Sequence, residues 1–312
     1  MMWLALALTW LGALPQEAEQ QEETFRFAVE VRTVYTDVFV TKEGQPVTGL
    51  TAWNFEVLDN GVPQEVELLD ANALPLSTIL LLDVSGSVLG DRAEQLRAAA
   101  HAFIEGLEPE DEVGLLTFTT DMHLRKGLST DFDTLHRVLE EATVQADTSL
   151  HDALFAGIKM VEARGGRPLI VLFTDGLDNM SWLTDVEVLD VLKESDAVVY
   201  VVAVEPLWRA GLSRSGRALR EKTAMSAHEF LQGITSATGG KVWHIDATTN
   251  IKDVFLRILT EMESRYLLSY EPVGVPREGW HTLEIRLRGK LVDEVRSRPG
   301  YLVSSKYKES DP

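Results

Sequence analysis

Two kinds of hydrophobic pattern alternate along the chain between residues 76 and 265. Some runs, such as residues 79–82, are continuously apolar, which is typical of a strand that is buried on both faces of a parallel sheet. Other segments, such as residues 91–107, repeat apolar side chains every three or four positions and place Leu96 and Phe103 on one face of a helix. This alternation predicts a doubly wound, Rossmann-like α/β fold with a mostly parallel sheet and right-handed crossovers.

The same criteria assign strands and helices along this whole region. Gly239 and Gly240 end one helical segment, because glycine commonly stops a helix at its carboxyl end. Strands are expected at residues 77–85, 112–119, 168–176, 197–205 and 241–246. Helices are expected at residues 91–107, 132–142, 149–164, 185–195, 227–240 and 251–265.

Strand-like patterns return on both sides of the α/β region. Residues 25–32 alternate apolar and charged side chains, which predicts a half-buried strand. The sequence Asp59-Asn60-Gly61 lies between apolar runs and predicts a hairpin, since Asn and Gly tolerate positive φ. Neither flank is long enough for a comfortable core of its own. We therefore expect the two flanks to pack together as one smaller β-sandwich-like unit, because chain ends commonly lie close together. The strands of the carboxyl-terminal flank are expected at residues 265–272, 280–290 and 292–301.

These patterns divide the chain into successive parts. The division predicts a signal peptide at 1–18, amino-terminal β strands at 24–75, the α/β domain at 76–265, carboxyl-terminal β strands that pack with the amino-terminal ones at 266–303, and a disordered tail at 304–312.

The first residues resemble a secretory signal. Trp3 to Leu14 is uncharged and apolar but too short to span a bilayer, and the acidic stretch 16–23 follows at once. No Lys or Arg precedes the apolar run, so the alternative is a short amino-terminal helix. We expect export to the periplasm or the medium. No later segment reaches about 18 consecutive apolar residues, so we expect no membrane span in the mature chain.

Charge and cysteine content narrow the classes of partner and of site. The chain has 29 Lys and Arg against 49 Asp and Glu, a formal net charge of −20. Such a charge argues against nucleic acid or an anionic membrane as the main partner. Cysteine is absent from the sequence, which excludes disulfides, thiolate metal sites and cysteine nucleophiles.

Oxygen-bearing side chains gather at one predicted edge of the sheet. Ligands of open parallel sheets bind beyond the carboxyl ends of the strands, where the strand order reverses. Carboxylates and hydroxyls suit a hard divalent cation, with Mg²⁺ the preferred ion and Mn²⁺ or Ca²⁺ the alternatives. Because Mg²⁺ keeps several waters, one position would remain open for a partner. The donors at this edge are Asp83, Ser85 and Ser87 after the first buried strand, Thr148 at a helix start, and Asp175 at a later strand end.

The order D-x-S-x-S, then a threonine that opens a helix, then T-D-G at a strand end resembles the von Willebrand factor type A domain. The resemblance covers about residues 76–265. In that family these positions form the metal-ion-dependent adhesion site, and an acidic side chain of the bound protein commonly completes the coordination. The resemblance implies that this chain is a non-enzymatic adhesion module. It also implies that the ion is held or oriented by Asp83, Ser85, Ser87, Thr148 and Asp175.

The flanking sequences extend the resemblance. The runs VTGLTAWNFEVLDNGVPQEV, YLLSYEP and RPGY look like those of the VWFA-related proteins that many bacteria export. One departure precedes the threonine of the motif, where Ala146 and Asp147 stand in place of the two glycines that are common in the family.

A basic segment follows the strand at 197–205. It leaves the carboxyl end of a sheet strand, so we expect it on the metal side, where it would help to select an acidic partner. The alternative is a solvated insertion without that role. The arginines in question are Arg209, Arg214, Arg217 and Arg220.

Other interpretations explain less of this pattern. A helix cap would account for Ser87 but not for Thr148 and Asp175 as well. A phosphatase that resembles haloacid dehalogenases would need an acid two residues after Asp83, where the chain has Ser85, so catalysis is not expected. A structural module in which the metal only stabilises the domain remains the competing class. Asp178 and Asn179 follow the T-D-G turn, and loop polarity or support of the metal ligands would explain them.

Overall fold

The middle of the chain forms a six-stranded sheet with the order β11-β10-β9-β6-β7-β8. The computed structural model describes residues 33–84, 91–141, 148–204, 227–246, 248–289 and 292–303. Neighbouring strands are parallel except for β7 and β8, which run antiparallel. The predicted doubly wound, mostly parallel sheet is therefore confirmed. Its strands are β6 (Leu76–Asp83), β7 (Glu112–Phe118), β8 (Met122–Ser129), β9 (Arg167–Thr174), β10 (Val198–Val204) and β11 (Val242–Ile245).

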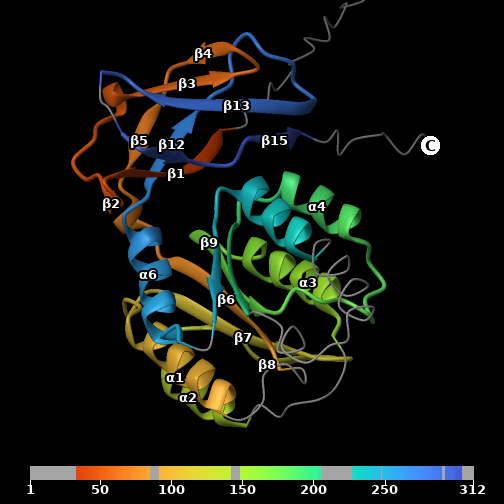
Figure 1. Cartoon of the computed structure of the whole chain (residues 1–312). Helices are drawn as coiled ribbons and strands as arrows, with labels where there is room; N and C mark the ends of the chain where they lie inside the picture. The colour runs from red at the N-terminus through yellow and green to blue at the C-terminus, as the bar shows by residue number, and fades with distance from the viewer. Residues whose placement is uncertain are drawn as a thin grey trace, which may run out of the picture. The chain divides into compact units, whose positions relative to one another are not determined.

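Helices cover both faces of this sheet. Alternate residues of β6 belong to different cores: Leu80 and Leu82 pack with α1, α2 and α6, whereas Ile79 and Leu81 pack with α3, α4 and the helical residues 227–238. Figure 1 shows α1 and α6 on one side of the sheet and α3 and α4 on the other. A strand with helices on both faces must be apolar throughout, which explains the continuous run in the sequence. The helices are α1 (Asp91–Glu105), α2 (Phe132–Glu140), α3 (Leu150–Glu162), α4 (Asp185–Glu194) and α6 (Ile251–Glu263).

Strand β8 was not predicted. The sequence pattern predicts no element between the strand at 112–119 and the helix at 132–142. A hairpin joins β7 to β8, and Thr119 N donates to Asp121 O across it at 3.0 Å. The register shifts twice along the β7–β8 pair, once on each side of Leu115. Such irregularities disturb the even alternation by which a strand is identified. The edge position also leaves Met122 and Leu124 exposed, so no buried run marks the strand.

The flanking strands form two antiparallel sheets, with the orders β14-β1-β12-β5 and β15-β13-β3-β4. Strands from both ends of the chain are paired, since β1 pairs with β12 and β14, and β3 pairs with β13. A separate hydrophobic core joins them, with Val38, Phe55 and Leu268 nearly inaccessible to solvent. The predicted sandwich built from both flanks is confirmed. Its strands are β1 (Val34–Lys42), β2 (Gln45–Pro46), β3 (Phe55–Asp59), β4 (Val62–Gln64), β5 (Glu67–Leu69), β12 (Tyr266–Tyr270), β13 (Gly279–Leu287), β14 (Glu294–Arg296) and β15 (Gly300–Val303).

The hairpin predicted at Asp59-Asn60-Gly61 connects β3 to β4. Asn60 and Gly61 have φ values of 46° and 79°, the left-handed conformation that a tight two-residue hairpin needs. The expected strand at 25–32, the signal peptide at 1–18 and the tail at 304–312 lie outside the described residues, and the domain bounds stay predictions.

Buried arginines connect the sandwich to the α/β domain. Arg167, at the start of β9, donates from Nη2 to Asp37 Oδ1 of β1 at 2.6 Å and to Met262 O of α6 at 2.9 Å. Arg298 donates to Asp196 Oδ1 at 2.6 Å. Arg265 contacts Asp37 O, Gly239 O and the Tyr200 hydroxyl. Ion pairs and hydrogen bonds of these arginines therefore link segments that are far apart in sequence.

A buried carboxylate organises the sandwich core. Asp59 is fully buried and accepts from the Tyr270 and Tyr301 hydroxyls at 2.9 and 2.7 Å, and His281 Nδ1 lies 2.8 Å from its other oxygen. Burial, aided by the neighbouring Asp59 carboxylate, raises the pKa of both Tyr270 and Tyr301 above the ordinary value.

Stability should therefore fall at alkaline pH. Above about pH 10 the unfolded chain releases its tyrosine protons while the folded sandwich retains those of Tyr270 and Tyr301, so the free energy of unfolding decreases as pH rises. Urea unfolding at intervals from pH 8 to 11.5 measures this slope. The slope should become shallower in Tyr301→Phe, and Tyr35→Phe, which alters an exposed tyrosine, should keep the wild-type slope. Equal slopes in all three proteins would contradict the assignment.

Candidate metal centre

The candidate site lies where the order of the strands in the sheet reverses. From β6 the chain proceeds through α1 to β7 on one side, and from β9 it proceeds through α4 to β10 on the other. The carboxyl ends of β6 and β9, which are adjacent parallel strands, therefore lie at the edge where α/β sheets commonly bind ligands. Asp83 is the last residue of β6, and Asp175 follows the last residue of β9. Both predicted carboxylates thus lie at this edge.

Asp83 is fully buried although it is an acid. Its Oδ2 accepts a hydrogen bond from Thr174 Oγ1 at 2.9 Å, and Thr174 Oγ1 accepts from Gly176 N at 3.0 Å. Gly176 has a φ of 80°, which L side chains rarely adopt, so glycine is needed where the chain turns after β9. The turn that carries Asp175 is consequently fixed to the Asp83 carboxylate through one threonine.

A chain of hydrogen bonds brings Thr148 to the same edge. Val84 N donates to Phe118 O at 3.1 Å, which joins the ends of β6 and β7. The next residue, Thr119, accepts from Ser149 N and from Ser149 Oγ, both at 2.8 Å. Because Ser149 is the N-cap of α3, this contact holds the start of α3 over the end of β7. Thr148 precedes it and is buried.

The loop after β9 closes the arrangement. Asn179 Oδ1 accepts from Thr148 N at 2.9 Å, and the N–H groups of Asn179 and Met180 donate to Thr148 O at 3.1 and 3.2 Å. Asp178 accepts from His151 N at 3.0 Å in the first turn of α3. From the sequence alone, either loop polarity or support of the metal ligands would explain Asp178 and Asn179. In the structure both hold the helix start that carries Thr148. The sequence signal was their position directly after the T-D-G turn.

Thr174 is a residue that the sequence analysis missed as part of the site. Its signal was the threonine of the T-D-G motif itself, whose hydroxyl points back to the neighbouring strand rather than outward. A hydroxyl that donates to one oxygen of a buried carboxylate orients that group, as outer-shell partners of metal ligands commonly do.

The remaining predicted ion ligands, Ser85 and Ser87, lie outside the described residues. So do the arginines predicted to select the partner, Arg209, Arg214, Arg217 and Arg220, and the roles of all six stay predictions. Among the residues that the structure describes, no group of three His, Asp or Glu side chains is placed to hold an ion.

The described donors suit a hard cation. Asp83, Asp175 and Thr148 offer carboxylate and hydroxyl oxygens, the ligand type of Mg²⁺ and Ca²⁺. An ionised carboxylate that is fully buried is costly unless hydrogen bonds or a cation compensate it. The residues that the structure describes thus fit the ion that the motif implies.

In the described part of the chain, no helix is both long enough and apolar enough to cross a membrane.

Comparisons with known proteins agree with this architecture. The family model of the von Willebrand factor type A domain matches residues 78–177. The inter-alpha-trypsin inhibitor heavy chain H4 of Bos taurus is 27% identical over 118 residues, which cover 34% of this chain and 13% of that protein. The protein of the same name from Sus scrofa is 24% identical over 116 residues, with the same coverage. The chain thus covers only 13% of the length of these relatives.

A search of solved structures returned a match at low identity. An aerotolerance-related membrane protein from Bacteroides fragilis, solved with multiple mutations to serines, is 19% identical, covers 60% of this chain and 98% of its own, and has a TM-score of 0.46. The match over residues 78–177, with the surrounding parallel sheet and its helices, identifies the chain as one that carries a von Willebrand factor type A domain.

Proposed function

We propose that this protein binds a protein partner through a divalent cation held at the carboxyl edge of the sheet. Asp83, Ser85 and Ser87 would hold the ion, and Thr148 and Asp175 would complete or orient its shell. Mg²⁺ is the proposed ion, and a carboxylate of the partner would fill the remaining position. The ion supplies the positive charge that attracts the partner's carboxylate. Domains of this type commonly mediate protein–protein interaction, which supports a protein as the partner.

The buried Asp83 carboxylate is the observation that carries this proposal. Strand β6 is buried along its whole length, and an acid at its end would weaken a purely structural strand. The Thr174 hydroxyl holds one oxygen of Asp83 at a fixed orientation. Backbone contacts with Asn179 and Met180 hold Thr148 at the same edge. Asp175 is held there by its own turn, in which its Oδ1 accepts from Leu177 N at 3.0 Å. A prepared donor set of this kind favours cation binding over a role in packing alone.

Removal of the Asp83 charge should weaken ion binding strongly while the fold persists. Asp83→Asn keeps the size of the side chain and an oxygen for the Thr174 hydroxyl. We expect Mn²⁺ affinity, measured by calorimetry as a stand-in for Mg²⁺, to fall at least about 100-fold, because losing even an outer-shell partner costs 10–100-fold. Asp190→Asn removes an exposed carboxylate of α4 and should bind Mn²⁺ as the wild type does. Unchanged affinity in Asp83→Asn would contradict the proposed ligand.

Removal of the ion distinguishes an ion that serves adhesion from one that serves only the fold. Partner capture and the melting temperature are compared in Mg²⁺ and in EDTA. If the ion serves binding, EDTA abolishes capture. The melting temperature then falls only by the small amount that the loss of any bound ligand causes. If the ion serves only the fold, EDTA lowers the melting temperature strongly and capture is lost only on unfolding.

A further inference from the structure

Trp182 is the most exposed large hydrophobic side chain of the described residues, with 94% of its surface accessible. It lies in the loop between β9 and α4, which leaves the edge of the sheet at Asp175. Met180 and Val186 are also exposed, at 44% and 61%, so three apolar side chains are presented within seven residues. Single exposed apolar residues are ordinary, but a group beside a candidate binding site indicates a contact surface.

The backbone that carries Trp182 is fixed. Asp152 on α3 accepts from Trp182 N and from Leu183 N, both at 3.0 Å, one with each carboxylate oxygen. Asp178 accepts from Ser181 N at 3.1 Å and from the Ser181 hydroxyl. Two carboxylates thus hold three consecutive residues around the tryptophan. A side chain presented on an ordered backbone binds without the cost of ordering the loop.

The tryptophan stands close to the proposed ion ligands. Met180 N donates to the backbone oxygen of Thr148, and Trp182 is two residues further along the chain. Two residues span at most about 7 Å, so a partner that reaches the ion at Thr148 also reaches the loop of Trp182. A single partner surface can therefore contact both.

The charges of residues 175–187 indicate which charges a partner would carry. Residues 175–187 include four acids, Asp175, Asp178, Asp185 and Glu187, and contain no Lys or Arg. Basic side chains on the partner would complement these acids and direct its approach. An anionic lipid surface would be repelled by the same acids.

We propose that Trp182 is the apolar anchor for the protein partner of the metal site. The partner segment carries an acidic side chain for the ion, apolar side chains that pack on Trp182, and Lys or Arg opposite the acids of residues 175–187. Tryptophan is the residue type most often found at the energetic centre of protein interfaces. This inference rests on the proposed function of the metal site.

A displayed library of random 12-residue peptides tests the proposal. Peptides are selected on the full chain in Mg²⁺ and eluted with EDTA, so that only ion-dependent binders are recovered. We expect the recovered peptides to combine one Asp or Glu with apolar residues and with Lys or Arg. Synthetic copies should bind Trp182→Ala at least tenfold more weakly than the wild type. Trp53→Ala is the matched control, because Trp53 is 71% exposed but belongs to the sandwich, and it should bind within twofold of the wild type.

The outcomes separate this inference from the proposed function. Mn²⁺ affinity should be the same in Trp182→Ala and the wild type, which shows that the ion site is intact. If the recovered peptides bind Trp182→Ala as tightly as the wild type, the anchor is wrong while the metal-dependent function stands. If EDTA releases no peptide from the wild type, the proposed function fails, and the anchor fails with it.

Discussion

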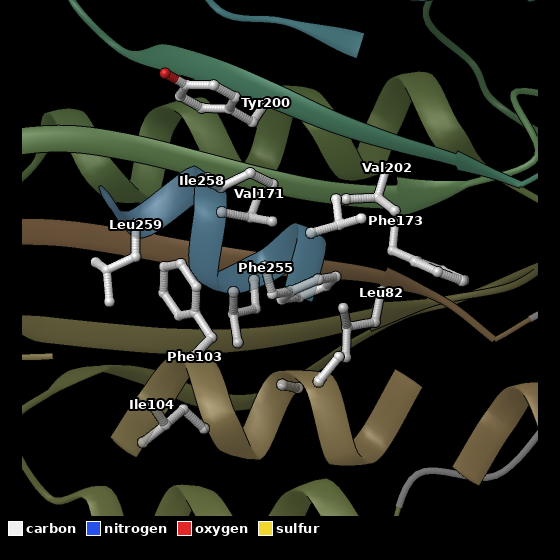
Figure 2. Packing of buried hydrophobic residues seen from close by; sticks show 14 of the residues in the cluster. Leu82, Phe103, Ile104, Val171, Phe173, Tyr200, Val202, Phe255, Ile258 and Leu259 are labelled. Carbon is white, nitrogen blue, oxygen red and sulfur yellow. The ribbon is translucent and has the colours of Figure 1, made fainter. Parts of the chain in front are cut away.

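Phe255→Ala should lower the free energy of unfolding by about 3–5 kcal/mol. Phe255 is fully buried on α6 and meets Phe103 of α1 edge to face, with ring centroids 6.2 Å apart. Figure 2 shows both rings in the layer between these helices and the sheet, beside Ile258 and Leu259. Alanine would leave a cavity among side chains from α1, α6 and the sheet, which cannot all move inward together. Urea unfolding monitored by circular dichroism gives this difference.

A conservative change at the same position serves as the control. Phe255→Leu keeps most of the apolar volume, so its loss should be clearly smaller than that of Phe255→Ala. Unfolding should stay two-state with an unchanged dependence on urea, since the variants alter stability and not the surface exposed. A loss below about 1 kcal/mol in Phe255→Ala would mean that α6 packs less closely on α1 than the structure indicates.

Arg167→Met should destabilise the protein to a similar extent, by about 3–5 kcal/mol. The Arg167 and Asp37 side chains are 4% and 8% exposed, and the guanidinium lies 2.6 Å from the carboxylate. Methionine keeps the apolar stem of the arginine but leaves the Asp37 carboxylate buried without its cation. The loss also removes the contact with Met262 O on α6, so both the sandwich and the α/β domain are affected.

A double variant distinguishes a lost ion pair from a simple packing defect. In Arg167→Met combined with Asp37→Leu neither charge of this pair is left, so the double variant should be more stable than Arg167→Met alone. The exposed pair of Asp190 and Lys193 is also 2.6 Å long, and Lys193→Met should cost at most about 0.5 kcal/mol. If the free energy of unfolding that the double variant loses equals the sum of the losses in Arg167→Met and in Asp37→Leu, the two side chains do not act as a pair.

The order of strands and helices in the α/β domain could be predicted because burial on two faces leaves a clear pattern. Strand β10 is buried at every position, and a run of such residues has few alternatives to a central strand. Strand β8 could not be found in the same way, because it lies at the edge and pairs through an irregular register. Its exposed Met122 and Leu124 resemble a loop as much as a strand.

The candidate site was predicted as a set of donors but not as an arrangement. Asp83 and Asp175 could be assigned to one edge because parallel strands carry their carboxyl ends to the same side. That Thr174 would orient Asp83, and that Asn179 would hold Thr148, could not be predicted. These contacts join residues 91 and 31 positions apart in sequence. No periodicity reports a hydrogen bond between distant loops.

By itself the sequence determined the class of fold, the sheet edge at which Asp83 and Asp175 lie, and the oxygen character of the candidate donors. Hydrophobic period and strand direction are local properties, and they suffice for these conclusions. Only the tertiary structure decided which charged side chains are buried, how Arg167 pairs with Asp37, and that the loop of Trp182 is held by Asp152. Those features depend on chain segments that meet only after folding, when desolvation makes each unpaired polar group costly and selects the pairing that satisfies it.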